Sequence, residues 1–238
     1  MVIGARERIH LLVALLPLPL IAVAAAALGD RAEPRTPRAV PTTAPAGVPE
    51  PVLREEFLDA YERSRRATWL ITYDFTRRLV NGGKLDLTVT YLNRPPDHLN
   101  IGLGGVSGRV GGRTVVCNEV EGRELCAPEG PVVPFEEELA SEISELRDVL
   151  QPPQKWYVVE GGGVREVSGE DARCFGLRRV ADVRSPPYGE RAEYCFATGD
   201  GAPLLNRRER TQGIDQRVAV EITRQVGDAE VAALLAPE

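Results

Sequence analysis

The sequence contains few of the residues from which catalytic sites are built. Only two histidines occur among its 238 residues, and one of them, His10, lies in the N-terminal segment of residues 1–29. His98 is therefore alone, and no Ser-His-Asp or Cys-His arrangement can be completed with a second histidine. We expect His98 to be a surface residue of a strand. The scarcity of histidine argues against an enzyme.

Motifs of catalysis and cofactor binding are also missing. The glycine-rich stretch Gly102–Gly112 has neither the G-x-G-x-x-G spacing nor the G-K-[ST] ending of phosphate-binding loops, so we interpret it as flexible hairpin turns. Ser107 within it lacks the G-x-S-x-G context of a nucleophile elbow. Glu136, Glu137 and Glu138 are explained by a helix N-terminus, where negative charge is stabilising. We expect no cofactor and no metal ion.

Positive charge is not in excess. The chain has 29 Lys and Arg against 35 Asp and Glu, for a net charge of −6. Nucleic-acid binding requires a clustered excess of basic residues, so we expect no nucleic-acid partner. The one basic cluster comprises Arg207, Arg208 and Arg210. We interpret it as protection of a sheet edge, and contact with anionic lipid head groups at a membrane surface is the alternative.

An apolar run stands at the N-terminus. Arg6 and Arg8 precede the run Leu11–Leu28, which contains no charged residue. Basic residues ahead of such a run keep the N-terminus in the cytoplasm and place the chain beyond the run outside. The sequence therefore predicts a protein of the cell membrane or a secreted protein, with its C-terminal domain outside the cytoplasm.

The run allows two interpretations, which differ in whether the N-terminal segment is cleaved from the protein. Its length of about 18 residues is just enough to span a bilayer as a helix. The small residues Ala22–Ala27 suit a signal peptidase, and Pro17 and Pro19 weaken a continuous helix. We favour an uncleaved transmembrane anchor over a cleaved signal peptide. No cysteine lies near the run, so a lipid-modified N-terminal cysteine is excluded.

We divide the chain into three segments. Residues 1–29 are the signal peptide or transmembrane anchor. Residues 30–50 are rich in Pro, Ala, Thr and Arg, a composition that favours an extended, disordered linker. Residues 51–238 form one extracytoplasmic domain that is long enough to bury a core of its own.

Hydrophobic periodicity predicts two helices and many antiparallel strands in this domain. Leu53, Phe57 and Ala60 recur at helical spacing within a helix from Val52 to Arg66. A second helix begins at Pro134 and ends at Leu150, before a pair of prolines. Strands are expected at residues 69–75, 85–91, 99–103, 113–120, 123–127, 155–160, 164–167, 172–180, 191–197, 204–211 and 217–223. A terminal turn or short helix is expected at residues 228–235.

The cysteines predict two disulfides. All four lie beyond the apolar run, and none has the C-x-x-C spacing of a zinc site or a redox motif. Three pairings of four cysteines are formally possible. Cys174 and Cys195 lie on consecutive expected strands and face the same side, while Cys117 and Cys126 flank a short loop. We therefore predict the disulfides Cys117–Cys126 and Cys174–Cys195.

Three segments carry a resemblance to a known family. They are FLDAYERSRRATWLITYDF at Phe57–Phe75, KLDLTVTYLNRPPDHLNI at Lys84–Ile101, and DARCFGLRRV followed by AEYCFATGDGAPLL within Asp171–Leu205. Together with the order of the elements, they resemble the LolA-like lipoprotein-carrier superfamily and its actinobacterial exported relatives over about residues 52–236. The resemblance implies an α+β fold in which a curved antiparallel sheet, or incomplete β-barrel, wraps on helices.

The resemblance also implies a cavity for acyl chains or other lipids. We hypothesise a non-catalytic, membrane-tethered protein that binds or carries a lipid or an acylated ligand. The alternative is a sensor or interaction domain of the cell envelope that binds a protein partner with the same fold. By family analogy, the candidate pocket residues are Trp69, Ile71, Leu87, Val89, Ile101, Val158, Phe175, Leu177, Phe196, Val220 and Ile222.

Overall fold

The computed structural model describes residues 48–102, 105–120 and 123–235, and the side chains of residues 118–131 are outside this description. The expected anchor and nearly all of the expected linker therefore lie outside the described residues, and the expected domain boundaries stay predictions. The first helix begins at Glu50, two residues before the expected start at Val52. None of the described helices is long and apolar enough to cross a membrane, and Leu11–Leu28 lies outside those residues.

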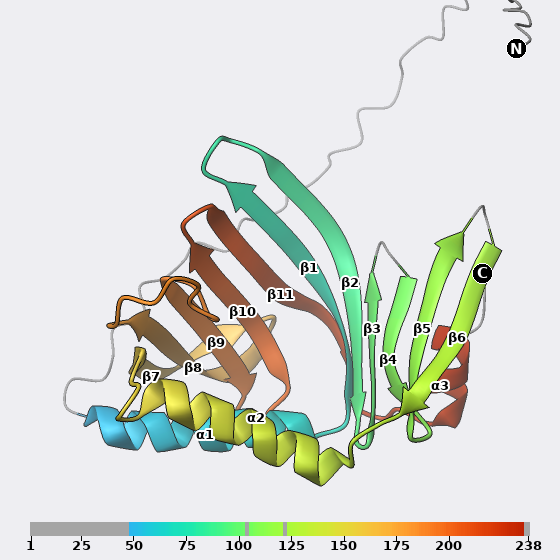
Figure 1. Cartoon of the computed structure of the whole chain (residues 1–238), viewed down its shortest axis with the longest axis horizontal. Coiled ribbons are helices and arrows are strands. Elements are labelled where there is room, and N and C mark those ends of the chain that lie inside the picture. The colour runs from blue at the N-terminus through green and yellow to red at the C-terminus, as the bar shows by residue number, and fades with distance from the viewer. Residues whose placement is uncertain (1–47, 103–104, 121–122, 236–238) are drawn as a thin grey trace, which may run out of the picture. The chain divides into compact units, whose positions relative to one another are not determined.

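The described chain contains three helices and eleven strands (Figure 1). The helices are α1 (Glu50–Arg66), α2 (Phe135–Leu150) and α3 (Asp228–Leu235). The strands are β1 (Trp69–Leu79), β2 (Lys84–Arg94), β3 (Asp97–Gly102), β4 (Gly105–Val110), β5 (Arg113–Val120), β6 (Arg123–Pro131), β7 (Tyr157–Val167), β8 (Glu170–Arg179), β9 (Arg191–Ala197), β10 (Pro203–Arg210) and β11 (Gly213–Thr223).

All eleven strands belong to one antiparallel sheet, in the order β6-β5-β4-β3-β2-β1-β11-β10-β9-β8-β7. Strands that follow one another in sequence pair with each other, except that β6 and β7 are at opposite edges. The pairing of β1 with β11 connects the two halves of the chain. The edge strands are β6 and β7, so the sheet is open, and it curves strongly in Figure 1. The expected α+β fold with a curved antiparallel sheet on helices is confirmed.

Helices α1 and α2 pack on one face of the sheet, which we call the inner face. Phe57 of α1 packs against Phe175 of β8 and Tyr194 of β9, with ring centroids 5.7 Å apart in both pairs. Leu146 and Leu150 of α2 join the same buried cluster. The apolar stripes of both helices therefore cover strands β7 to β9, as the helical periodicity predicts.

Helix α3 lies on the opposite, outer face. Val231 of α3 belongs to a buried cluster with Leu92 of β2 and Leu99 of β3. Asn93, next to Leu92, instead bonds the C-terminal end of α1. Because successive side chains of a strand point to opposite faces, α1 and α3 are on opposite sides of the sheet. The short helix expected at residues 228–235 is confirmed, and its role is to cover this face.

We expected the glycine-rich stretch Gly102–Gly112 to form hairpin turns, but it also forms a strand. It contains strand β4, which pairs with β3 and β5. Gly108 has a φ of +154°, and a Cβ at this position would lie 2.1 Å from the backbone oxygen of His98. The glycine therefore permits a close approach of two strands, which the sequence pattern does not reveal.

Two further expectations about the strands are corrected. Strand β7 is one strand of 11 residues, not two short ones, because a bulge at Gly162 continues the pairing with β8. Strand β10, which carries Arg207, Arg208 and Arg210, lies between β9 and β11 in the sheet. Protection of a sheet edge therefore does not explain this basic cluster.

Candidate functional site

The register of the sheet shows which side chains share the inner face with α1. Tyr194 of β9 is opposite Asn206 of β10, Asn206 is opposite Arg217 of β11, and Arg217 is opposite Phe75 of β1. Directly opposed residues of antiparallel strands project from the same face. The inner face therefore continues from the helix-covered strands β7–β9 onto β10, β11, β1 and β2.

Burial on this face decreases along the β1–β2 hairpin. At the start of β1, the inner-face residues Trp69, Ile71 and Tyr73 are buried. Farther along the hairpin the apolar character persists, but the side chains are only half-buried. We call these residues the apolar strip, which consists of Phe75, Leu87, Val89 and Tyr91. Leu87 lies opposite Phe75, and Val89 lies opposite Tyr73, so the strip is continuous with the core.

Arg217 lies at the apolar strip, and Arg208 lies beside it. The guanidinium carbon of Arg217 is 5.0 Å from the ring centroid of Tyr91 and 5.8 Å from that of Phe75. The guanidinium carbon of Arg208 is 5.6 Å from the ring of Tyr188 and 5.9 Å from that of Tyr194. Each arginine is thus held by two aromatic rings through cation–π contacts.

These two arginines form no ion pair with a carboxylate among the described residues, although Arg217 is near enough to Asp215 to help lower its pKa. By contrast, Arg207 on the same strand pairs with Glu209 at 2.7 Å, and Arg210 lies 3.8 Å from Asp215. Within the described segments of the chain, the Nε atom of Arg208 and the hydroxyl of Tyr194 are buried and make no well-formed hydrogen bond. Such unsatisfied polar atoms are rare in folded proteins and mark positions that a ligand can complete.

The tyrosines of this site stay neutral near physiological pH. Burial raises the pKa of Tyr188 to about 12. Burial also raises the pKa of Tyr194, and the charge of Arg208 opposes this effect. The nearest carboxylate in the register, Asp215, is opposite Arg208 but binds Arg77 at 2.6 Å. The arginines therefore give this region of the inner face a local positive charge.

A second polar group lies where the helices cross β2 and β4. Arg65 of α1 bonds Glu142 of α2 at 2.9 Å, and Arg109 of β4 bonds Glu138 of α2. His98 lies on a strand, as we expected, and its side chain is half-buried. Burial lowers its pKa, and Arg65 and Arg109 lower it further, while Glu138 and Glu142 oppose them. These ion pairs attach α2 to the rest of the domain.

The helix N-terminus of α2 also differs from the simple expectation. Glu136, Glu137 and Glu138 occupy its first turn, where they complement the helix dipole. In addition, Glu136 bonds Arg66 at 2.8 and 2.9 Å, and Glu138 bonds Arg109. No group of three or more metal-ligating side chains occurs among the residues that the structure describes.

A surface depression of about 540 Å³ lies beside α1. Its rim carries charges of both signs, and Glu56 in it bonds Arg173. Because its charged residues largely face opposite charges, this depression offers less unpaired charge than the Arg208 and Arg217 region. It is lined by Glu56, Asp59, Glu62, Arg63, Arg66, Arg173, Phe175, Phe196, Ala197 and Thr198.

The structure distributes the predicted pocket residues over several places. Phe175, Leu177 and Phe196 pack against the helices, and Trp69, Ile71, Val89 and Ile222 belong to a second cluster around β1. Ile101 packs with α3 on the outer face, and Val220 is 55% exposed. Val158 alternates with the helix-facing Tyr157 and Val159, so it points away from them. Leu87 and Val89 alone lie on the apolar strip.

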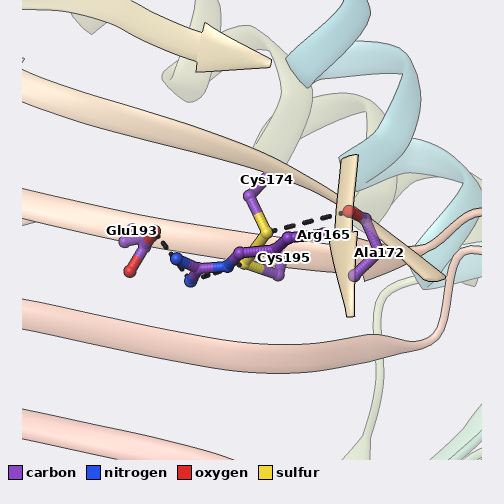
Figure 2. The surroundings of a disulfide bond; sticks show 5 residues. All are labelled: Arg165, Ala172, Cys174, Glu193 and Cys195. Atoms are coloured by element: carbon purple, nitrogen blue, oxygen red, sulfur yellow. Dashed lines mark hydrogen bonds and ion pairs between the residues drawn. A yellow bond between two sulfur atoms is a disulfide. The ribbon is translucent and has the colours of Figure 1, made fainter. Parts of the chain in front are cut away.

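The cysteines agree with the sequence as far as they are described. Cys174 and Cys195 form the predicted disulfide, which is buried (Figure 2). It belongs to the buried cluster around β1, and Arg165 beside it pairs with Glu193 at 2.8 Å. Cys117 is opposite Cys126 in the β5–β6 pair. The side chain of Cys126 is outside the described ones, so the Cys117–Cys126 pairing stays a prediction.

Comparison with known proteins identifies similar folds. No protein-family model matches the sequence, and no curated protein matches it. The MucA/MucB complex structure from Pseudomonas aeruginosa is similar over 77% of this chain, with a TM-score of 0.49 and 19% identity. That match spans 61% of the solved chain. The architecture observed here is an open antiparallel sheet with helices on its inner face.

For two other solved structures, the match with this chain covers almost their whole length. The lipoprotein LppX from Mycobacterium tuberculosis has a TM-score of 0.39 and 12% identity, over 75% of this chain and 99% of that one. A LolA superfamily protein from Nitrosomonas europaea has a TM-score of 0.32 and 6% identity, over 78% of this chain and 97% of that one. These similarities concern the fold, and the ligand must be inferred from the residues of this chain.

Proposed function

We propose that this protein binds the apolar part of an amphiphilic ligand on the inner face of its sheet and that it does so without catalysing a reaction. The apolar strip is the single observation that carries this proposal. Phe75, Leu87, Val89 and Tyr91 are only half-buried, although they continue a buried core. An acyl chain can cover such half-exposed apolar side chains. Each methylene that is buried in this way makes the free energy of binding more favourable by about 0.8 kcal/mol.

We further propose that this binding takes place outside the cytoplasm, with the protein attached to the membrane by residues 1–29. The Cys174–Cys195 disulfide supports this location, since disulfides persist in oxidising compartments. The charge order around Leu11–Leu28 supports the same orientation. A tethered domain of this kind takes up or senses a lipid close to the membrane surface.

A second candidate is a domain that binds a protein partner in the cell envelope. The turn of the β1–β2 hairpin favours it, because the apolar side chains there are well exposed. Leu79 is 41% exposed, Val80 is 79% exposed and Leu85 is 43% exposed. Exposed apolar residues that group together often mark interaction surfaces. Copurification of lipid separates the two candidates.

The test is native mass spectrometry and lipid extraction of the full chain produced in an oxidising compartment. We compare Leu87→Glu, on the apolar strip, with Thr88→Glu, the exposed neighbour on the other face. We expect a lipid adduct on the wild-type protein, at least a tenfold lower lipid content in Leu87→Glu, and no change in Thr88→Glu. A wild-type protein without lipid, or equal losses in both variants, would contradict the proposal.

A further inference from the structure

We infer that Arg208 and Arg217 together bind the anionic head group of the ligand, so that the ligand is an acidic amphiphile with a phosphate or carboxylate end. This inference rests on the proposed function and extends it to the class of ligand. It does not follow from the overall charge of the chain, which is negative. It follows from the position, the aromatic surroundings and the missing partners of these two side chains.

The two arginines are placed to act on one anion. Arg208 of β10 is opposite Asp215 of β11, and Arg217 lies two residues farther along β11. They are therefore diagonal neighbours on the same face, a separation of about 7–8 Å between their backbones that long side chains can bridge. Arg217 leans toward the rings of β1 and β2, whereas Arg208 leans toward Tyr194 of β9. An anionic head group over β10 and β11 therefore has a positive charge on each side and accepts hydrogen bonds from the guanidinium that it reaches.

The aromatic contacts hold the two guanidinium groups in place at the inner face. Arg217 lies against Phe75 and Tyr91, and Arg208 lies against Tyr188 and Tyr194. Cation–π contacts engage the flat faces of the guanidinium, while the N–H donors point outward from its edge. Both side chains are thus held in place with hydrogen bonds still to give.

Two buried polar atoms at the same place make no well-formed hydrogen bond within the described residues, although Arg208 and Asn206 lie close enough to the Tyr194 hydroxyl to act on its pKa. They are the Nε atom of Arg208 and the hydroxyl of Tyr194, whose residue is only 7% exposed. A buried donor without an acceptor is unfavourable and is expected to be satisfied by another molecule. An anion at the guanidinium of Arg208 supplies the missing acceptor. The free protein thus holds donors that an acidic head group matches.

The position of Arg217 connects the head group to the apolar chain. Its guanidinium contacts Phe75 and Tyr91, which are the two aromatic members of the apolar strip. An anion held by Arg217 therefore lies at the strip, and a chain attached to it can continue along Leu87 and Val89. A free inorganic anion uses only the arginines, whereas an acidic amphiphile uses both regions of the surface.

Calorimetric titration of the full chain tests this inference with defined probes below their critical micelle concentrations. The probes are dodecanoate, the neutral dodecanol with an equal chain, and inorganic phosphate. We expect dodecanoate to bind at least tenfold more tightly than dodecanol, and inorganic phosphate to bind much more weakly. In the double variant Arg208→Gln/Arg217→Gln, dodecanoate and dodecanol should bind equally.

Control variants separate charge from folding. Arg207→Gln removes an arginine that is paired with Glu209 on the same strand, and we expect it to keep the preference for dodecanoate. Arg217→Lys keeps the charge, and we expect it to retain most of the preference for dodecanoate. This variant tests the inference independently if the double variant does not fold. Equal binding of dodecanoate and dodecanol to the wild type overturns the head-group inference and leaves the proposed function intact.

The remaining outcomes are also decisive. If neither dodecanoate nor dodecanol binds, the proposed function itself fails. If inorganic phosphate binds as tightly as dodecanoate, the site recognises a free anion and the inference of an amphiphile is wrong. If Arg207→Gln reduces the preference as much as the double variant does, general electrostatic attraction, and not the pair Arg208 and Arg217, explains the binding.

Discussion

The side-chain amide of Asn93 donates a hydrogen bond of 2.6 Å to the backbone oxygen of Ala67, the residue that directly follows α1. The same amide group bonds the backbone oxygen of Arg65 at 2.9 Å. The last carbonyls of a helix lack partners within the helix, so a buried side chain that supplies them fixes the helix end. Asn93 thereby attaches α1 to the inner face of β2, next to the start of β1.

The first prediction concerns this attachment. Asn93→Ala leaves two buried carbonyl groups without their donor, and we expect it to lower the free energy of unfolding by about 2 kcal/mol. Urea unfolding of the oxidised protein measures the change. Asn100→Ala, at an exposed position of β3, is the control and should change the stability by less than about 0.5 kcal/mol. Equal effects of the two substitutions would show that the attachment contributes nothing.

The second prediction concerns the bulge in β7. Gly162 has a φ of +85°, and a Cβ at this position would lie 2.6 Å from a methyl group of Leu53 in α1. We expect Gly162→Ala to destabilise the protein by about 1–3 kcal/mol through backbone strain and displacement of α1. Gly169→Ala is the matched control, because its φ is +79° and no atom lies near its Cβ position. Thermal unfolding of both variants should show the larger loss for Gly162→Ala.

The third prediction concerns the Cys174–Cys195 disulfide, which joins residues 21 positions apart. Closing a loop of this length restricts the unfolded chain, so replacing both cysteines by alanine should reduce stability by about 3 kcal/mol. Urea unfolding of the double variant gives the value. An unchanged unfolding midpoint would mean that the disulfide does not limit the unfolded chain.

The fourth prediction concerns the second disulfide. Because Cys117 and Cys126 are directly opposed in the ladder, we expect them to be bonded to each other. Proteolysis without reduction, followed by mass spectrometry, should give one linked peptide pair for Cys117 with Cys126 and one for Cys174 with Cys195. A peptide that links Cys117 to Cys174 would refute the pairing.

The fifth prediction concerns pH. Burial, Arg65 and Arg109 lower the pKa of His98 below its ordinary value of 6.5, against the opposing charges of Glu138 and Glu142. The unfolded chain therefore binds a proton more readily than the folded one, and this residue makes stability fall as the pH drops below about 6.5.

We expect His98→Gln to flatten the decrease of the urea midpoint between pH 7 and pH 5. The only other histidine of the sequence is His10, which lies outside the described residues. The pH dependence of the variant is compared with that of the wild type in one buffer series. A parallel decrease in both proteins would show that His98 does not titrate differently in the folded state.

Much of the fold was predictable from side-chain alternation. Strand β9 (Arg191–Ala197) and helix α3 (Asp228–Leu235) have the bounds that their patterns indicate, because each is flanked by clear turn residues. Strand β4 was missed, since glycine carries no hydrophobic pattern and the strand exists through its pairing with β3 and β5. Pairing between distant segments, such as β1 with β11, is likewise absent from local patterns.

The site was less predictable than the fold for a related reason. In the sequence, Arg207, Arg208 and Arg210 form one basic cluster, whereas the structure gives Arg207 and Arg210 carboxylate partners and leaves Arg208 among aromatic rings. Those rings come from Tyr188 and Tyr194, and the register of β9 and β10 decides which arginine meets them. No local signal distinguishes an arginine with a partner from one without.

The most direct test of the account is photo-crosslinking with a dodecanoate that carries a photoreactive diazirine near its methyl end. The labelled residues of the full chain are located by mass spectrometry, with unlabelled dodecanoate as competitor. The account predicts competed labelling at inner-face positions of β1, β2 and β11, at or beside Phe75, Leu87, Val89 and Tyr91. Competed labelling confined to the outer face or to the exposed turn residues Leu79, Val80 and Leu85 would contradict it.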